Sequence, residues 1–190
     1  MDSTPDSDQK PSYLGLLNAI VLAERRGHAV LDAWRWATPL PALADTLNVV
    51  AIREQAHAAE FTKRLCELGY GVRERPSATF EADLALARSG APDADKFRCI
   101  LGYGDPEEAS RPDPLAALFA DRTIDPVTGA LLGRFIAEER DSERRLRAAW
   151  RGLPASGDPA GGTDDDLLAE VAERIDRLTA TLEELKRLRR

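Results

Sequence analysis

REQAHAAEF, residues 53 to 61, decides the fold prediction, because it sets a carboxylate and an imidazole on the inner face of a helix. Glu54 and His57 are three residues apart and share one face of a helix with about 3.6 residues per turn. An ionised carboxylate in an apolar core is strongly unfavourable unless it is paired or bound to a cation. We therefore expect partners for both side chains on neighbouring helices. The rest of the face is apolar: Leu43, Leu47, Val50, Phe61, Leu65 and Leu68.

Two long antiparallel helices are predicted around this stretch. The first covers residues 12 to 37, which follow Pro11 and contain no further proline before TPLP, residues 38 to 41. The second begins at Pro41 and ends at Gly69, a residue that accepts the left-handed backbone of a helix end. The short connection makes the two helices antiparallel.

The first helix supplies a partner for the polar pair. Glu24 is the lone carboxylate near the middle of its apolar stripe. Two antiparallel helices of similar length bring their middles together, so we expect Glu24 to meet Glu54 and His57. The other members of this stripe are Leu17, Ile20, Gly27, Leu31 and Trp34.

A third long helix, residues 126 to 153, repeats the pattern with an offset of 85 residues. Glu139 corresponds to Glu54, and Ser142 corresponds to His57. A second inward carboxylate is therefore predicted in the same frame, whereas the histidine is not repeated. The other members of this stripe are Leu132, Phe135, Leu146, Ala149 and Leu153.

These features resemble the ferritin-like superfamily. Its four-helix bundle binds two iron or manganese ions through a Glu from each of two helices and a Glu-x-x-His motif from each of the other two. Glu54 and His57 match one such motif, and Glu24 matches a lone Glu. Glu139 matches the second motif, which has Ser142 in place of the histidine.

The resemblance covers residues 12 to 152 and implies a fold, a cofactor and a chemistry. The fold is all-α, an antiparallel four-helix ferritin-like bundle. The cofactor is iron, or else manganese or zinc. The chemistry is iron oxidation, peroxide reduction or oxygenation of a small molecule, and the sequence does not identify that substrate or establish an enzyme. One nitrogen and three carboxylates suit one ion, or a strained pair completed by water. The metal ligands are then Glu24, Glu54, His57 and Glu139.

The ligand set departs from the family pattern in two ways. Ser142 is a poor ligand for Fe²⁺, so a second ion would lose a nitrogen donor. The third-helix carboxylate is left open, because residues 78 to 113 are broken by proline and turn-forming residues. Its candidates are Glu81, Asp83 and Asp121. Asp141 or Glu143, beside Ser142, can restore a carboxylate if the helix rotates locally.

The competing interpretation is a non-enzymatic helical scaffold or interaction protein with a vestigial metal site. In that case His57 is an imidazolium that pairs two carboxylates, and Ser142 bonds to a carboxylate or to the backbone. His28 lies at the edge of the stripe beside two arginines, so we expect it to have a surface or supporting role.

Four regions are predicted along the chain. Residues 1 to 11 form a polar, disordered tail, and residues 12 to 152 form the bundle. Short helices at residues 80 to 90, 93 to 104 and 113 to 121 make up its broken third-helix region. A flexible acidic linker covers residues 153 to 164. Residues 165 to 190 form an additional amphipathic helix with a coiled-coil-like seam, through which we expect a homo-oligomer.

Composition excludes several function classes. The formal charge of −7 argues against a nucleic-acid surface, which needs clustered basic residues. No apolar run approaches the roughly 20 residues of a membrane span, so we expect no membrane association. The two cysteines form no disulfide framework, which favours a reducing cytoplasm.

Overall fold

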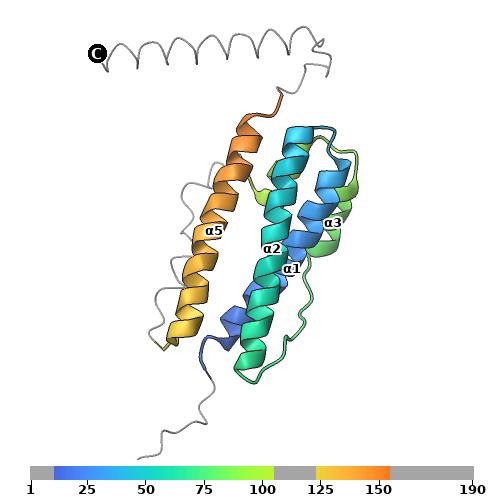
Figure 1. The fold of residues 1–190 in the computed structure, drawn as a ribbon. Coiled ribbons are helices and arrows are strands. Elements are labelled where there is room, and N and C mark those ends of the chain that lie inside the picture. Colours follow the sequence, from blue (N-terminus) through green and yellow to red (C-terminus); the bar gives the residue numbers. More distant parts are fainter. Residues whose placement is uncertain (1–10, 105–122, 155–190) are drawn as a thin grey trace, which may run out of the picture. The chain divides into compact units, whose positions relative to one another are not determined.

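The computed structural model describes residues 11–104 and 123–154, and these contain helices and no strand (Figure 1). The all-α prediction is confirmed for this part of the chain, and each of its helices lies close to its predicted position. The helices are α1 (Leu14–Ala37), α2 (Pro41–Glu67), α3 (Phe80–Arg88), α4 (Asp93–Leu101) and α5 (Pro126–Arg151).

The three long helices lie side by side, with α2 between α1 and α5 in the pattern of contacts (Figure 1). Helix α2 runs antiparallel to both, because its C-terminal half packs against the N-terminal halves of the other two. Gly69 closes the α2 end as predicted, with a φ of 83° that favours glycine. The backbone N–H of the next residue, Tyr70, donates to the Leu65 carbonyl.

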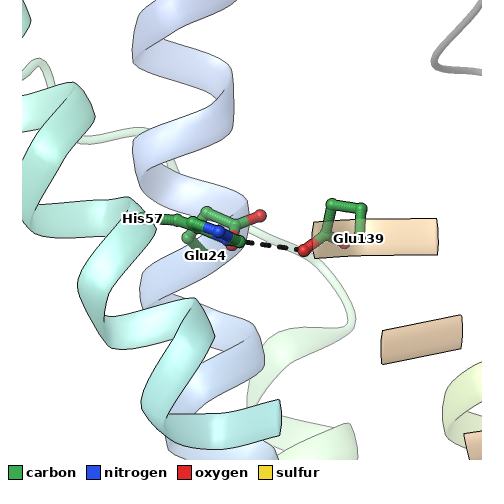
Figure 2. Close-up of side chains that lie close together, drawn as sticks. All are labelled: Glu24, His57 and Glu139. Atoms are coloured by element: carbon green, nitrogen blue, oxygen red, sulfur yellow. Dashed lines mark hydrogen bonds and ion pairs between the residues drawn. The ribbon is translucent and has the colours of Figure 1, made fainter. Parts of the chain in front are cut away.

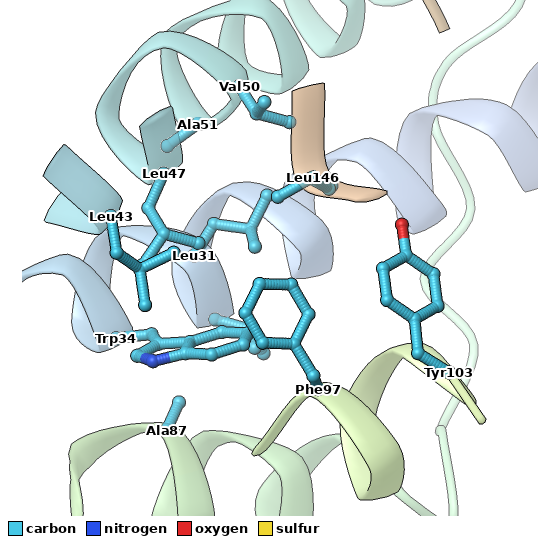
Figure 3. Packing of buried hydrophobic residues seen from close by; sticks show 11 residues of the cluster. Leu31, Trp34, Leu43, Leu47, Val50, Ala51, Ala87, Phe97, Tyr103 and Leu146 are labelled. Atoms are coloured by element: carbon cyan, nitrogen blue, oxygen red, sulfur yellow. The ribbon is translucent and has the colours of Figure 1, made fainter. Parts of the chain in front are cut away.

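Two apolar clusters fill the bundle, one toward each end. The first joins the start of α1 to the end of α2 and the start of α5; Leu17 and Phe61 are fully buried there. The second joins the other ends of these helices to α3 and α4 around Trp34 and Phe97 (Figure 3). The middle of the bundle, between the two clusters, is where the polar positions of the three stripes lie.

Asp125 fixes the start of α5 against the other long helices. Its carboxylate accepts hydrogen bonds from the backbone N–H groups of Val127 and Thr128, which caps the helix. It also accepts a 2.6 Å hydrogen bond from the Tyr13 hydroxyl and lies 2.9 Å from an Arg64 nitrogen. These contacts hold α5 in register with α1 and α2.

The short helices α3 and α4 pack at the second cluster through buried polar contacts. Asp93 accepts hydrogen bonds from the Trp34 indole and the Thr38 hydroxyl. The fully buried Lys96 donates to the carbonyl of Ala87, at the end of α3. These contacts tie both short helices to the end of α1.

The four-helix arrangement stays a prediction, because the described residues hold three long helices. The predicted helix at residues 113 to 121 lies outside the described residues. So do most of the tail, residues 1 to 11, most of the linker, residues 153 to 164, and all of the C-terminal helix, residues 165 to 190. The described helices belong to a compact unit that ends at Leu153. None of them has the length and apolar character needed to cross a bilayer.

Candidate metal centre

Glu24, His57 and Glu139 come from α1, α2 and α5 and point toward one another in the middle of the bundle (Figure 2). One nitrogen of His57 and one carboxylate oxygen of each glutamate lie within 4.8 Å of one another. Glu24 is 5% exposed and His57 is 1% exposed. The predicted convergence of acids from separate helices is therefore present.

The two ring nitrogens of His57 face different carboxylates. Nδ1 lies 3.0 Å from Oε2 of Glu24 and 3.4 Å from Oε1 of Glu139. Nε2 lies 2.7 Å from Oε2 of Glu138, on the other side of the ring. The ring lies nearly perpendicular to that of Phe135, with the ring centroids 5.0 Å apart. Nδ1 is thus the nitrogen that faces the predicted ligands.

Oε1 of Glu139 is buried and has no hydrogen-bond partner. A buried carboxylate oxygen without a partner is unfavourable by about 1–3 kcal/mol, and more when it is charged. This oxygen faces Nδ1 of His57, at the point where the three side chains meet. A cation bound between them would satisfy it.

The fourth predicted ligand, Glu54, lies beside this group. It is half-buried, and its Oε2 would lie only 2.5 Å from a Cβ atom added to Gly27. Burial, together with the charges of Glu24 and Glu139, raises the pKa of Glu54 to about 9. Gly27 on α1 therefore leaves the space that the Glu54 carboxyl occupies.

The same surroundings shift the pKa values of His57 and Glu24. Burial lowers the pKa of His57, but the carboxylates of Glu139, Glu24 and Glu138 outweigh burial and raise it to about 10. Burial also raises the pKa of Glu24, against the hydrogen bond with His57. Without metal, His57 is an imidazolium and Glu54 is neutral at pH 7. The expected conflict among the carboxylates is thus resolved by two bound protons.

The three donor atoms could bind a small divalent ion if they moved slightly closer together. Nitrogen and oxygen ligands lie about 2.0–2.2 Å from zinc or a similar ion, so opposite donors are at most ~4.4 Å apart. The observed limit of 4.8 Å is only slightly larger. An imidazole nitrogen with carboxylate oxygens suits iron, manganese and zinc.

Ser142 is buried as predicted, but its partner is a guanidinium. Nη1 of Arg53 donates to Oγ of Ser142 at 3.2 Å and to Oδ2 of Asp141 at 2.8 Å. The expected bond from Ser142 to a carboxylate or the backbone is therefore replaced by Arg53. Asp141 also pairs with two arginines of its own helix, and Glu143 accepts a hydrogen bond from Tyr103. Neither acid belongs to the three-residue group.

A cavity of about 310 Å³ borders the group between α1, α5 and the short helices. Glu54 and Glu139 form part of its wall, together with aliphatic side chains such as Val50 and Leu146. Asp83 of α3, one of the third-helix candidates, also lines this cavity, outside the three-residue group. Glu81 is exposed, and Asp121 lies outside the described residues.

Sequence reasoning missed Glu138, whose contact with Nε2 is the shortest that His57 makes. It lies one position before Glu139, three residues after Phe135 and four before Ser142, so helical periodicity could have marked it as inward. His28 lies outside the three-residue group, with its Nδ1 2.9 Å from the Ala51 carbonyl oxygen, and its surface or supporting role stays a prediction.

Comparison of the chain with models of known families, with curated proteins and with solved structures gave no match. The arguments for function therefore rest on the geometry above.

Proposed function

We propose that this protein binds one divalent first-row metal ion, with iron first, manganese and zinc next. Glu24, His57 and Glu139 would hold the ion, and Glu54 would join them when it loses its proton. The observation that carries the proposal is the convergence of a His57 nitrogen with a carboxylate oxygen of Glu24 and of Glu139 within 4.8 Å. The buried Oε1 of Glu139 lies in an ion pair with His57 at 3.4 Å but makes no hydrogen bond, which leaves it open to a cation.

We further propose ferritin-like redox chemistry, in which iron is oxidised or peroxide is reduced. An Fe²⁺ ion held by these carboxylates and one imidazole would supply electrons to dioxygen or peroxide. The residues of the chain supply the setting: Glu24 and His57 are almost fully buried, and the cavity beside Glu54 and Glu139 gives small molecules access. The support for this chemistry is the donor set and the resemblance of its motifs.

Elemental analysis of protein purified without chelator tests the metal proposal. We expect about one ion per chain in the wild type and loss of the ion from His57→Ala and Glu54→Ala. His28→Ala is the matched control, because His28 contacts a backbone carbonyl and should leave the metal content unchanged. Oxygen consumption on adding Fe²⁺, compared between the wild type and His57→Ala, then tests the redox step.

A specific observation favours the scaffold as the second candidate function. The imidazolium of His57 already has hydrogen-bond acceptors on both nitrogens, Glu24 at 3.0 Å and Glu138 at 2.7 Å. A protein that has lost its metal could keep its core in this way. This candidate predicts metal-free protein on purification, together with a gain in thermal stability from Glu54→Leu, since a half-buried carboxyl beside the charges of Glu24 and Glu139 is removed.

We also propose that the chain forms a homo-oligomer in a reducing cytoplasm. The support is the leucine-rich seam of residues 165 to 190, which lies outside the described residues, and the free thiols of Cys66 and Cys99. Light scattering of the full chain and of a chain stopped at Pro154 tests the oligomer. The same number of chains per particle in both would rule out the seam as the interface.

A further inference from the structure

We infer that Glu138 is a positioning residue: it holds the Nε2–H of His57 and so directs Nδ1 toward the metal. This inference rests on the proposed function. Glu138 is not itself a member of the donor set, because it lies on the opposite side of the imidazole from Glu24 and Glu139.

The two nitrogens of an imidazole have different roles at a metal site. A neutral ring carries one N–H and one lone pair, and the hydrogen bond at one nitrogen decides which of them is free to bind a metal. Oε2 of Glu138 lies 2.7 Å from Nε2, the shortest of the contacts described for this ring. The proton therefore stays on Nε2, and the lone pair is left on Nδ1, which faces Glu24 and Glu139.

The Glu138 carboxylate is itself held in place. Its Oε1 lies 3.8 Å from Nε of Arg134, one turn earlier on α5, while Oε2 is directed to the ring. Arg134 also pairs with Glu60 of α2. The Phe135 ring packs edge-on against His57, with an interplanar angle of 82°, and so limits rotation of the imidazole. The two ring nitrogens thus have separate roles: the hydrogen bond at Nε2 orients the ring, and Nδ1 binds the metal.

The effect of losing Glu138 follows from this arrangement. Partners that orient a metal-binding histidine typically contribute about 10- to 100-fold to metal affinity. The side chain of Glu138 is 38% exposed, so truncation leaves no large buried cavity. We expect Glu138→Ala to fold normally and to bind metal about 10- to 100-fold more weakly. Glu138→Gln keeps an acceptor oxygen and should recover most of that loss.

The test uses Zn²⁺, which is diamagnetic, and protein labelled with ¹⁵N at histidine. The chain has two histidines, and His28→Gln assigns their ring signals. In the wild type, we expect Zn²⁺ to shift the Nδ1 signal of His57 as a metal ligand, while Nε2 keeps its proton. In Glu138→Ala, we expect the weaker affinity and rapid exchange of the Nε2 proton with water. Glu60→Ala is the matched control, because it removes the other acid that pairs with Arg134.

Two results would overturn the inference, and they differ in meaning. If Glu138→Ala binds Zn²⁺ as tightly as the wild type, with the same protected Nε2 proton, the positioning role is wrong and the metal centre stands. If Zn²⁺ leaves the His57 signals of the wild type unchanged, the metal centre itself is wrong, and the positioning role falls with it.

Discussion

Nδ1 of His57 and Oε1 of Glu139, which makes no hydrogen bond, form an ion pair at 3.4 Å between two helices that the chain brings together across more than eighty residues. Helices α2 and α5 meet here because the apolar cluster and the Asp125 contacts at one end fix their register. A site in the middle of a bundle depends on that register. His57 and Glu139 therefore serve both the packing of α2 against α5 and the proposed metal binding.

The stability of the metal-free protein should fall as the pH rises from 6 to 9. For His57, the pKa rises from an ordinary 6.5 to about 10 on folding, so its contribution is present below pH 6.5 and is lost as pH approaches 10. For Glu54, the pKa rises from 4.5 to about 9 on folding. Between these values the side chain is ionised in the unfolded chain but neutral in the folded protein, so stability falls as the pH rises. Both effects have the same sign. Thermal melts in the presence of chelator measure the slope.

The control for the pH prediction is Glu54→Gln, which should melt with a shallower slope between pH 6 and 9. Asp125 and Asp141 have pKa values lowered by their hydrogen-bond and ion-pair partners, so they titrate in acid and do not contribute in this window. Equal slopes for the variant and the wild type would show that Glu54 is ionised in the folded protein.

The affinity for metal, unlike the stability of the metal-free protein, should rise as the pH rises from 6 to 8. His57 must lose its Nδ1 proton before that nitrogen can bind an ion, and its pKa of about 10 makes this loss costly at neutral pH. We expect the apparent Kd for Zn²⁺ to fall by up to about tenfold per pH unit between pH 6 and 8, for each proton released. Calorimetric titration in two buffers of different ionisation enthalpy counts those protons. An affinity that does not vary with pH would exclude His57 as a ligand.

Gly27→Ala should weaken metal binding without destabilising α1. An added Cβ would lie 2.5 Å from Oε2 of Glu54, so the carboxyl must move. Alanine also favours a helix over glycine by about 1 kcal/mol. We expect weaker metal binding with little loss of thermal stability. Gly133→Ala in α5 is the control, because nothing lies within 4 Å of its added Cβ, and it should keep metal binding unchanged.

Ser142→His should raise the metal capacity from one ion per chain to two. Ser142 is buried and borders the 310 Å³ cavity beside Glu54 and Glu139, so an imidazole there adds the nitrogen donor that the second motif lacks. Arg53 would keep its contact with Asp141. Manganese or zinc content per chain is the measurement, with Ser142→Asn as the control for added bulk. A capacity that stays at one ion would show that the cavity cannot hold a second.

The sequence predicts the fold of the long helices and most of the site, for identifiable reasons. Pro41 and Gly69 mark helix ends by their backbone chemistry, and helical periodicity places Glu24, His57 and Glu139 inward. Periodicity allows Glu138 as well as Glu139 between Phe135 and Ser142, but it cannot decide which of the two reaches Nδ1 of His57 and which reaches Nε2. The Arg53–Ser142 contact could not be predicted either, because it depends on how two long helices are rotated against each other.

Anomalous diffraction from crystals grown with Mn²⁺ tests the metal centre most directly. We expect one strong peak in the middle of the bundle, within coordination distance of Nδ1 of His57 and of a carboxylate oxygen each of Glu24 and Glu139. Nε2 of His57 should remain hydrogen-bonded to Glu138. Density without such a peak, in which both nitrogens of His57 still bond to glutamates and Oε1 of Glu139 stays unpartnered at high Mn²⁺ concentration, would contradict it.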